Sequence, residues 1–213
     1  MTYYYWKAEI LKEECEKIIS EFDTSLSGKL ATVGNLHGTE GLYPEEIEAM
    51  KKEGRWDYLH NKSKNEDVPD TSIRKTKLNW LPANHIYNKI LCEFVTTTNE
   101  KHYHYNLTKF TPCQFARYDV GDFYDYHQDS GQSKEDYENE TRKLSMTVQL
   151  SDPDSYEGGK FLFYDGSRKE DEPPIQEQGS IIVFDSRMWH RITPVTKGVR
   201  YSLVSWSLGP SFQ

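Results

Sequence analysis

The stretch KLSMTVQL, residues 143–150, decides the fold, because its apolar and polar side chains alternate without a break. Leu144, Met146, Val148 and Leu150 fall on one face of an extended chain, as expected of a β-strand that buries one side. Similar short runs rich in aromatic and β-branched residues surround it; they are QFARYD (114–119), DFYDYHQD (122–129), KFLFYD (160–165), SIIVFDS (180–186), HRITPV (190–195) and RYSLVSWS (200–207). The second half of the chain therefore predicts a series of strands.

Turn-forming stretches separate these strands, namely DPDSYEGG (152–159), DGSRKEDEPP (165–174), EQGS (177–180) and TKG (196–198). Short strands at this spacing are typical of a sandwich or barrel. We therefore predict a mainly β, α+β protein in which residues 111–207 form the core, as a β-sandwich or a jelly roll.

The first 110 residues have a different character and predict helices packed outside that core. Three segments carry helical signals: LKEECEKIISEF (11–22), PEEIEAMKK (44–52) and IYNKILCEFV (86–95). Residues 24–43 and 57–72 are polar and predict long loops, whereas IRKTKLNWL (73–81) predicts a strand. Because the chain shows no repeat and no low-complexity linker, we expect a single domain over residues 1–213, with 1–110 as helix-rich support.

The bulk composition argues against several classes of protein. The net charge of −8 disfavours a general nucleic-acid binder, which needs a basic surface. No apolar run reaches the length of a membrane span, and the N-terminal residues lack the pattern of a signal peptide. Cys15, Cys92 and Cys113 are too few and too scattered for a disulfide framework. We therefore expect reduced thiols and a cytoplasmic location.

The run YDYHQDS, residues 124–130, indicates a metal site. If it is extended, Asp125, His127 and Asp129 share one face. A histidine and a carboxylate two residues apart can bind one divalent ion, and His190 is the best candidate for a third ligand. Two histidines and one carboxylate can occupy one face of an octahedral iron and leave the other open. An HxD pair alone is a weak signal, and Asp125 is the competing carboxylate.

The remaining histidines favour structural or surface roles. His37, His60 and His85 lie in polar or helical surroundings. His102 and His104 in KHYHY have no nearby acid, so we interpret this segment as a solvated lead-in to a strand.

Arg200 and Ser202 are two residues apart on one predicted strand and form a candidate anion site. A guanidinium beside a hydroxyl suits a carboxylate, and the phenol of Tyr118 offers a third donor. The turn at Lys197–Gly198 would place His190 and Arg200 on adjacent antiparallel strands. Taken singly, a surface arginine and a core tyrosine remain the alternatives.

Together these residues resemble the 2-oxoglutarate- and Fe(II)-dependent oxygenases, and within them the prolyl 4-hydroxylase-like branch. The resemblance covers about residues 114–207 in three ordered pieces, RYDVGDFYDYHQDS, RKLSMTVQLSDPDSYEGGKFLFY and GSIIVFDSRMWHRITPVTKGVRYSLVSW. It implies a double-stranded β-helix, the cupin-like variant of a jelly roll. It also implies that His127, Asp129 and His190 bind Fe(II), and that Arg200 holds the distal carboxylate of 2-oxoglutarate with Tyr118.

The resemblance implies supporting roles for further residues. Ser202 would assist Arg200, and Tyr124 and Trp206 would be the aromatic residues near the site. Gly158 and Gly159 would form the turn of a hairpin. Nucleic-acid demethylases of the superfamily carry a second arginine where Trp206 stands, and the iron-dependent halogenases lack the carboxylate that Asp129 supplies, so both activities are disfavoured.

The implied reaction is hydroxylation of a peptidyl residue, proline first of all, with 2-oxoglutarate and O2 converted into succinate and CO2 and ascorbate as a reductant. Two alternatives remain open: a hydroxylase of a free amino acid or small metabolite, and a non-catalytic, cupin-like metal-binding module. The polar segments 24–43, 57–72 and 130–141 are lids over a protein or peptide substrate, or else ordinary solvated loops. The acids of SGQSKEDYENE (130–140) would favour a basic peptide.

Overall fold

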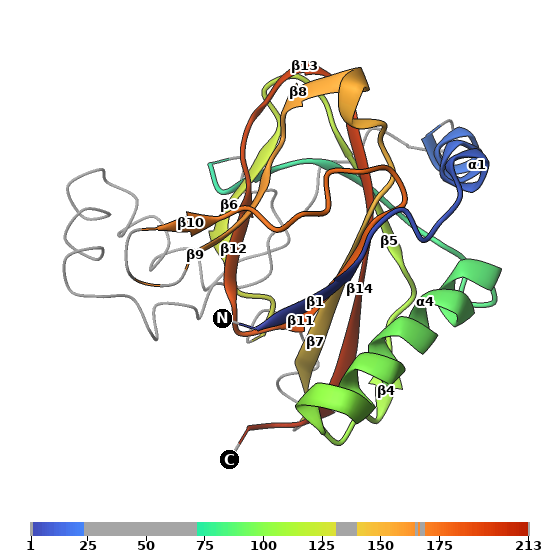
Figure 1. The fold of residues 1–213 in the computed structure, drawn as a ribbon, viewed down its shortest axis with the longest axis vertical. Coiled ribbons are helices and arrows are strands. Elements are labelled where there is room, and N and C mark those ends of the chain that lie inside the picture. The colour runs from blue at the N-terminus through green and yellow to red at the C-terminus, as the bar shows by residue number, and fades with distance from the viewer. Residues whose placement is uncertain (1, 24–71, 131–139, 165, 167–168, 213) are drawn as a thin grey trace, which may run out of the picture.

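The computed structural model describes residues 2–23, 72–130, 140–164, 166 and 169–212 of the 213-residue chain. Two antiparallel sheets face one another, and two helices cover the outer side of the larger sheet (Figure 1). The expectation of a mainly β jelly roll with N-terminal helices outside it is confirmed. The expected helix at 44–52 and the loops at 24–43 and 57–71 lie outside the described residues.

Within the described residues the larger sheet has seven strands in the order β1-β11-β7-β14-β5-β3, with β4 also paired to β14. Their bounds are Tyr3–Trp6 (β1), Ile181–Asp185 (β11), Glu140–Gln149 (β7), Arg200–Pro210 (β14), Gln114–Tyr118 (β5), Lys77–Trp80 (β3) and Lys109–Phe110 (β4).

The smaller sheet, again counted over the described residues, has five strands in the order β10-β9-β12-β6-β2. These strands span Glu170–Asp171 (β10), Phe161–Tyr164 (β9), Trp189–Ile192 (β12), Phe123–His127 (β6) and Arg74–Lys75 (β2). A separate antiparallel pair joins β8 (Tyr156–Gly158) and β13 (Val195–Gly198), next to a short 3₁₀ turn at Pro153–Ser155.

The alternation along 143–150 is confirmed, and both faces of the strand are buried. Leu144, Met146, Val148 and Leu150 belong to the apolar core between the larger sheet and the helices. The polar face, with Thr147 and its neighbours on β7, is directed into the space between the two sheets, where Thr147 lines a cavity. A strand in the middle of a sandwich has no solvent face, so its polar side chains serve the interior.

Helix α1 (Lys12–Asp23) begins with two acids in its first turn, which suit the positive end of a helix. It buries Cys15, Ile18 and Phe22, spaced three and four residues apart, against the larger sheet. All three cysteines are free, as the sequence predicts.

Helix α4 (Ile86–Thr98) begins after His85, whose ring accepts a hydrogen bond from the Tyr87 N–H. The helix continues into a π-helix, η2 (Asn99–Tyr103), which ends at His104 in a left-handed conformation. KHYHY (101–105) is therefore not an extended lead-in to a strand: its first three residues belong to η2, and the next strand, β4, begins only at Lys109.

Two other expectations about strands are corrected. IRKTKLNWL is not one strand: β2 pairs with β6 in the smaller sheet, whereas β3 pairs with β5 in the larger one. HRITPV is broken at Thr193–Pro194, since β12 ends at Ile192 and β13 begins at Val195. Strand β1, which pairs with β11, was not predicted from the aromatic N-terminal residues.

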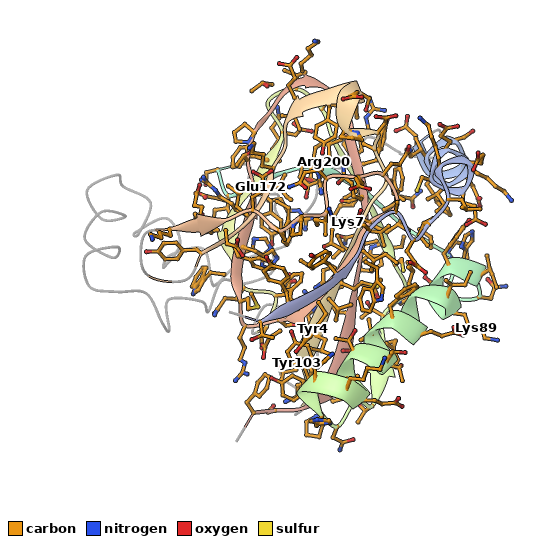
Figure 2. The ribbon with its side chains drawn as sticks, viewed as in Figure 1. Tyr4, Lys7, Lys89, Tyr103, Glu172 and Arg200 are labelled. Carbon is orange, nitrogen blue, oxygen red and sulfur yellow. The ribbon has the colours of Figure 1, made fainter. Side chains whose placement is uncertain are left out.

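Leu91 of α4 offers a test of the core between helices and sheet. The side chain is 1% exposed, so Leu91→Ala should lower the free energy of unfolding by about 2–5 kcal/mol. Urea denaturation followed by circular dichroism measures this. Lys89→Ala, on the outward face of the same helix (Figure 2), should change stability by less than about 0.5 kcal/mol. An equal loss in both variants would contradict the assignment of the buried face.

Candidate metal centre and anion pocket

Three side chains from two strands of the smaller sheet meet at one point. His127 is the last residue of β6, and His190 of β12 is its direct cross-strand partner. Asp129 lies two residues beyond the end of β6, with its Oδ1 atom 3.6 Å from His127 Nε2 and its Oδ2 atom 3.5 Å from His190 Nε2. All three are buried, and their ligand atoms lie within 4.8 Å of one another. This spacing suits one metal ion between them.

The two imidazoles are oriented so that Nε2 of each is free to bind. His127 Nδ1 lies 2.8 Å from the carbonyl oxygen of Asp125, and His190 Nδ1 lies 2.9 Å from that of Met188. A carbonyl can only accept, so each Nδ1 carries the proton and each Nε2 presents a lone pair. Burial and the neighbouring His190 hold the pKa of His127 well below its usual range, which keeps the ring neutral. Neutral histidines are the form that binds metals.

Asp129 is fixed by contacts to the larger sheet. Its backbone N–H donates to the carbonyl of Ser186, and its Oδ2 accepts a 2.6 Å hydrogen bond from Ser145 Oγ on β7. Burial alone would raise the pKa of Asp129, but His190, His127, Arg142 and this hydroxyl lower it to about 2. The carboxylate is therefore ionised and can serve as a metal ligand.

Ser145 was missed by sequence reasoning, although its place on the polar face of KLSMTVQL was a usable signal. We expect Ser145→Ala to weaken metal affinity about 10–100-fold, because the hydroxyl orients Asp129. Competition with a chelating dye measures the affinity. The control is Ser205→Ala, which removes a hydroxyl bonded instead to the carbonyl of Thr111. Equal affinities in the Ser145 variant and the unmodified protein would show that the contact is dispensable.

A cavity of about 250 Å³ opens between the two sheets over this cluster. Several predicted site residues line it: the three residues above, Tyr118, Tyr124, Arg200, Ser202 and Trp206. The ring of Tyr124 stacks on that of His127 with centroids 3.5 Å apart. Arg74, Trp80, Gln114 and Arg142 also line the cavity and were not predicted.

Arg200 is the largest fully buried side chain, with 1% of its surface exposed (Figure 2). Its Nη1–H donates to Ser202 Oγ at 3.3 Å, and the guanidinium lies 5.4 Å from the centre of the Tyr118 ring. Within the described residues no carboxylate pairs with it. A buried charge without a partner is costly, so this end of the cavity suits an anionic ligand.

The structure corrects how Arg200 reaches the site. His190 and Arg200 are not on adjacent strands, because β12 belongs to the smaller sheet and β14 to the larger one. They face each other across the cavity. Strand β13, which pairs with β8, lies between them in the chain, where a simple hairpin was expected.

Two further expectations about the site differ from the structure. Gly158 and Gly159 do not form a hairpin turn, because β8 pairs with β13 whereas β9 pairs with β12. Both adopt positive φ, and a Cβ on Gly159 would lie 3.0 Å from Arg200 Cδ. Asp125 is not part of the metal cluster; its Oδ1 accepts from the Tyr126 N–H.

Asp185, at the end of β11, anchors the turn that carries Ser186 and Met188. Its carboxylate accepts hydrogen bonds from the Arg187 side chain and from the Tyr105 hydroxyl. Burial alone would raise the pKa of Asp185, but these partners lower it.

A carboxyl whose pKa is lowered on folding stabilises the protein above its unfolded value of about 3.9. That stability is lost as the pH falls through the folded value. We expect Asp185→Asn to flatten the decline of thermal stability below about pH 4. Melting curves between pH 7 and pH 3 measure this, and an unchanged slope would contradict it.

The fold and the site define a jelly-roll protein with a buried His-Asp-His cluster beside an unpaired arginine. Comparison with known families gives the same class, because residues 113–208 match the 2OG-Fe(II) oxygenase superfamily. The match agrees with the resemblance to the 2-oxoglutarate- and Fe(II)-dependent oxygenases over this segment, which is somewhat less than half of the chain.

Curated relatives and solved structures extend the comparison. A PKHD-type hydroxylase of Synechococcus sp. (strain CC9605) is 37% identical over 94 residues, 43% of this chain and 39% of that protein. One of Thermosynechococcus vestitus is 38% identical over 95 residues, 45% of this chain and 42% of that protein. The match thus spans about two fifths of each relative.

Two solved structures share the fold at low identity. A Pseudomonas putida prolyl-4-hydroxylase has a TM-score of 0.64 at 15% identity, covering 96% of this chain and 91% of that one. A viral collagen prolyl hydroxylase from Paramecium Bursaria Chlorella virus-1, in a 2OG complex, has a TM-score of 0.62 at 17% identity, covering 98% and 97%. None of the helices in the described part of the chain has the length and apolar character needed to cross a bilayer.

Proposed function

We propose that this protein is an Fe(II)- and 2-oxoglutarate-dependent dioxygenase that hydroxylates its substrate. One observation carries the proposal: a preoriented His-Asp-His cluster and a buried arginine without a carboxylate partner among the described residues line the same cavity. Nitrogen and carboxylate ligands suit Fe(II), and the charge on Arg200 suits a diacid. Fe(II) bound there would supply the redox chemistry by which O2 and 2-oxoglutarate give succinate, CO2 and a hydroxylated product.

The residues of the chain have distinct tasks in this proposal. His127, Asp129 and His190 hold the metal on one face and leave the other open. Arg200 binds the distal carboxylate of 2-oxoglutarate and thereby points its other end toward the metal. Ser202 keeps the guanidinium in place through their hydrogen bond.

Other cavity residues shape the environment of that ligand. Tyr118 supports the same anion through its position beside Arg200. Tyr124 holds the His127 ring by stacking, and the apolar side chains of Phe161 and Ile192 exclude water from the metal. Ascorbate as a reductant stays a prediction.

For the substrate we propose a peptidyl residue, proline first, in a protein or peptide partner. The names of the curated relatives support a hydroxylase. Support for a prolyl peptide comes from a fold neighbour, a Trichoplax adhaerens prolyl hydroxylase in complex with a hypoxia inducible factor peptide fragment, with a TM-score of 0.53 at 17% identity. A free amino acid or small metabolite is the second candidate. The expected lid segments lie almost entirely outside the described residues.

A non-catalytic, cupin-like metal-binding module is the remaining alternative. It has no use for a buried, unpaired arginine beside the metal, so Arg200 favours the enzyme. Succinate formation from 2-oxoglutarate in air, with Fe(II) and a panel of proline-containing peptides and free amino acids, tests the proposal. Mass spectrometry for a gain of one oxygen identifies the product. No succinate above a metal-free control under any of these conditions would refute it.

A further inference from the structure

Besides Arg200, the cavity contains a second group of hydrogen-bond donors that lack acceptors. We call Arg74, Arg142 and Trp206 the mouth cluster. Arg74 and Trp206 are 8% and 6% exposed, and both Arg74 Nε and Trp206 Nε1 are buried without a hydrogen-bond partner in the described structure. Unsatisfied buried donors are rare and costly, and these two belong to side chains that line the same cavity.

The two arginines of the mouth cluster are held by stacking rather than by acids. The Arg142 guanidinium lies 3.9 Å from the centre of the Trp206 ring, and that of Arg74 lies 4.4 Å from the centre of the Tyr124 ring. Arg74 also donates one hydrogen bond to Gln114 Oε1 at 3.2 Å. Neither arginine forms an ion pair within the described residues.

The only acid that lines the described cavity is Asp129. Its oxygens already face the two histidines and Ser145. The mouth cluster therefore brings two guanidinium groups to the cavity, and the one described acid there, Asp129, is shared with the two histidines.

The mouth cluster is separate from the Arg200 end of the cavity. Trp206 lies six residues from Arg200 on β14, which is about 20 Å along a strand. Trp206 is the cross-strand partner of Ser145, the residue that bonds Asp129. A 2-oxoglutarate molecule held between Arg200 and the metal thus leaves the mouth cluster free for the substrate.

We propose that the substrate carries a carboxylate, which the mouth cluster binds at the end of the cavity away from Arg200. The inference rests on the proposed function, because it assigns the substrate class of the same site. Arginine forks and an indole N–H supply donors only, and a planar carboxylate accepts from two of them at once. The carboxylate is either the α-carboxylate of a free amino acid or an acidic side chain beside the target residue of a peptide.

Binding without turnover tests this directly. Protein loaded with Fe(II) and 2-oxoglutarate under anaerobic conditions is titrated by calorimetry with matched pairs of compounds. One arm compares free L-amino acids with their carboxamides. The other compares N-acetylated, C-amidated proline peptides that carry Asp or Glu beside proline with peptides that carry Asn or Gln there. In at least one arm we expect the compound with the carboxylate to bind at least tenfold tighter than its matched amide. The arm that shows this preference tells whether the carboxylate belongs to a free amino acid or to an acidic side chain of a peptide.

Two variants assign the preference to the mouth cluster. Trp206→Phe keeps an aromatic ring under Arg142 but removes the N–H, and Arg74→Gln removes the charge. Each substitution should reduce the preference for the carboxylate over its amide to less than threefold. The Kd for 2-oxoglutarate should stay within threefold of that of the unmodified protein. The control is Arg191→Gln: Arg191 also has a buried Nε without a partner, but it pairs with Glu170, stacks on Tyr126 and does not line the cavity. It should keep the full preference.

The inference is overturned if no carboxylate binds tighter than its amide, or if both variants keep the preference. It is equally overturned if only phosphate-bearing probes, inorganic phosphate and a dinucleotide, bind at the mouth cluster. Succinate formation in air separates the two proposals. Hydroxylation of amides as fast as of acids refutes the carboxylate site and leaves the oxygenase. A carboxylate preference without any succinate in air refutes the oxygenase and leaves the anion site.

Discussion

Asp129→Ala is expected to abolish metal-dependent succinate formation, with a loss of at least about a thousandfold, equivalent to about 4 kcal/mol. Among the described residues, Asp129 is the one carboxylate that lies against both histidines, and its Oδ2 accepts a hydrogen bond from the Ser145 hydroxyl. Removing it leaves two imidazoles that cannot fix an ion on one face. The metal content after dialysis measures the loss of metal binding, and succinate release measures the loss of activity.

Asp125→Asn is the matched control for that variant. Asp125 is two residues before His127, as Asp129 is two after it, but its carboxylate lies outside the metal cluster. The variant should bind metal and form succinate at rates within about threefold of the unmodified protein. Normal activity in Asp129→Ala, or equal losses in both variants, would show that the wrong carboxylate has been assigned.

Arg200→Gln is expected to raise the KM for 2-oxoglutarate about 10- to 150-fold, because a charge-assisted hydrogen bond to a carboxylate contributes about 1.5–3 kcal/mol. Arg200→Lys should be intermediate, since the ammonium keeps the charge but not the fork. Steady-state rates against 2-oxoglutarate concentration measure this. Because Arg200 binds 2-oxoglutarate and not the metal, the affinity of the variant for the metal without 2-oxoglutarate should stay within about threefold of that of the unmodified protein.

A control on the same stretch of chain is Lys197→Gln, three residues before Arg200. Lys197 pairs with Glu157 at the surface, where such pairs contribute little, so the variant should behave as the unmodified protein. If Arg200→Gln left the KM for 2-oxoglutarate unchanged, the buried guanidinium would have a structural role only.

The jelly-roll core could be predicted from the sequence because its strands carry a strong local signal. In residues 143–150 polar and apolar side chains alternate without a break, and both faces of the resulting strand are buried. Leu144 packs in the apolar core toward the helices, and Ser145 donates a hydrogen bond to Asp129. Helix α4 was equally readable from its apolar spacing.

The pairing of the strands was harder to predict from the sequence, because it depends on contacts between residues far apart in the chain. A turn at 197–198 favours a local hairpin between the strands before and after it. In the structure the chain instead leaves the smaller sheet after β12, passes Pro194 and β13, which pairs with β8, and enters the larger sheet as β14. Arg200 therefore reaches the cavity from the sheet that faces His190. The sequence offered His127 and His190 together with either Asp125 or Asp129, and the family resemblance favoured Asp129, which is the carboxylate that clusters with the two histidines.

Arg74 and Arg142 could not be identified from sequence. Arg74 lies on a two-residue strand within a polar, basic segment, where an arginine is most often solvated. Its burial follows only from the pairing of β2 with β6, which places it over Tyr124. Long-range packing of this kind decides which arginines line the cavity, and no local pattern encodes it.

The most direct test of the account is a titration of 2-oxoglutarate into the Fe(II)-loaded protein without oxygen, followed by the weak visible absorbance of the iron chelate. We expect a band that saturates at one equivalent per chain, is absent from Asp129→Ala, and needs more than tenfold higher 2-oxoglutarate in Arg200→Gln. A protein that binds Fe(II) yet develops no such band, or an Asp129→Ala protein that keeps it, would contradict the assignment of these side chains to one iron and one co-substrate.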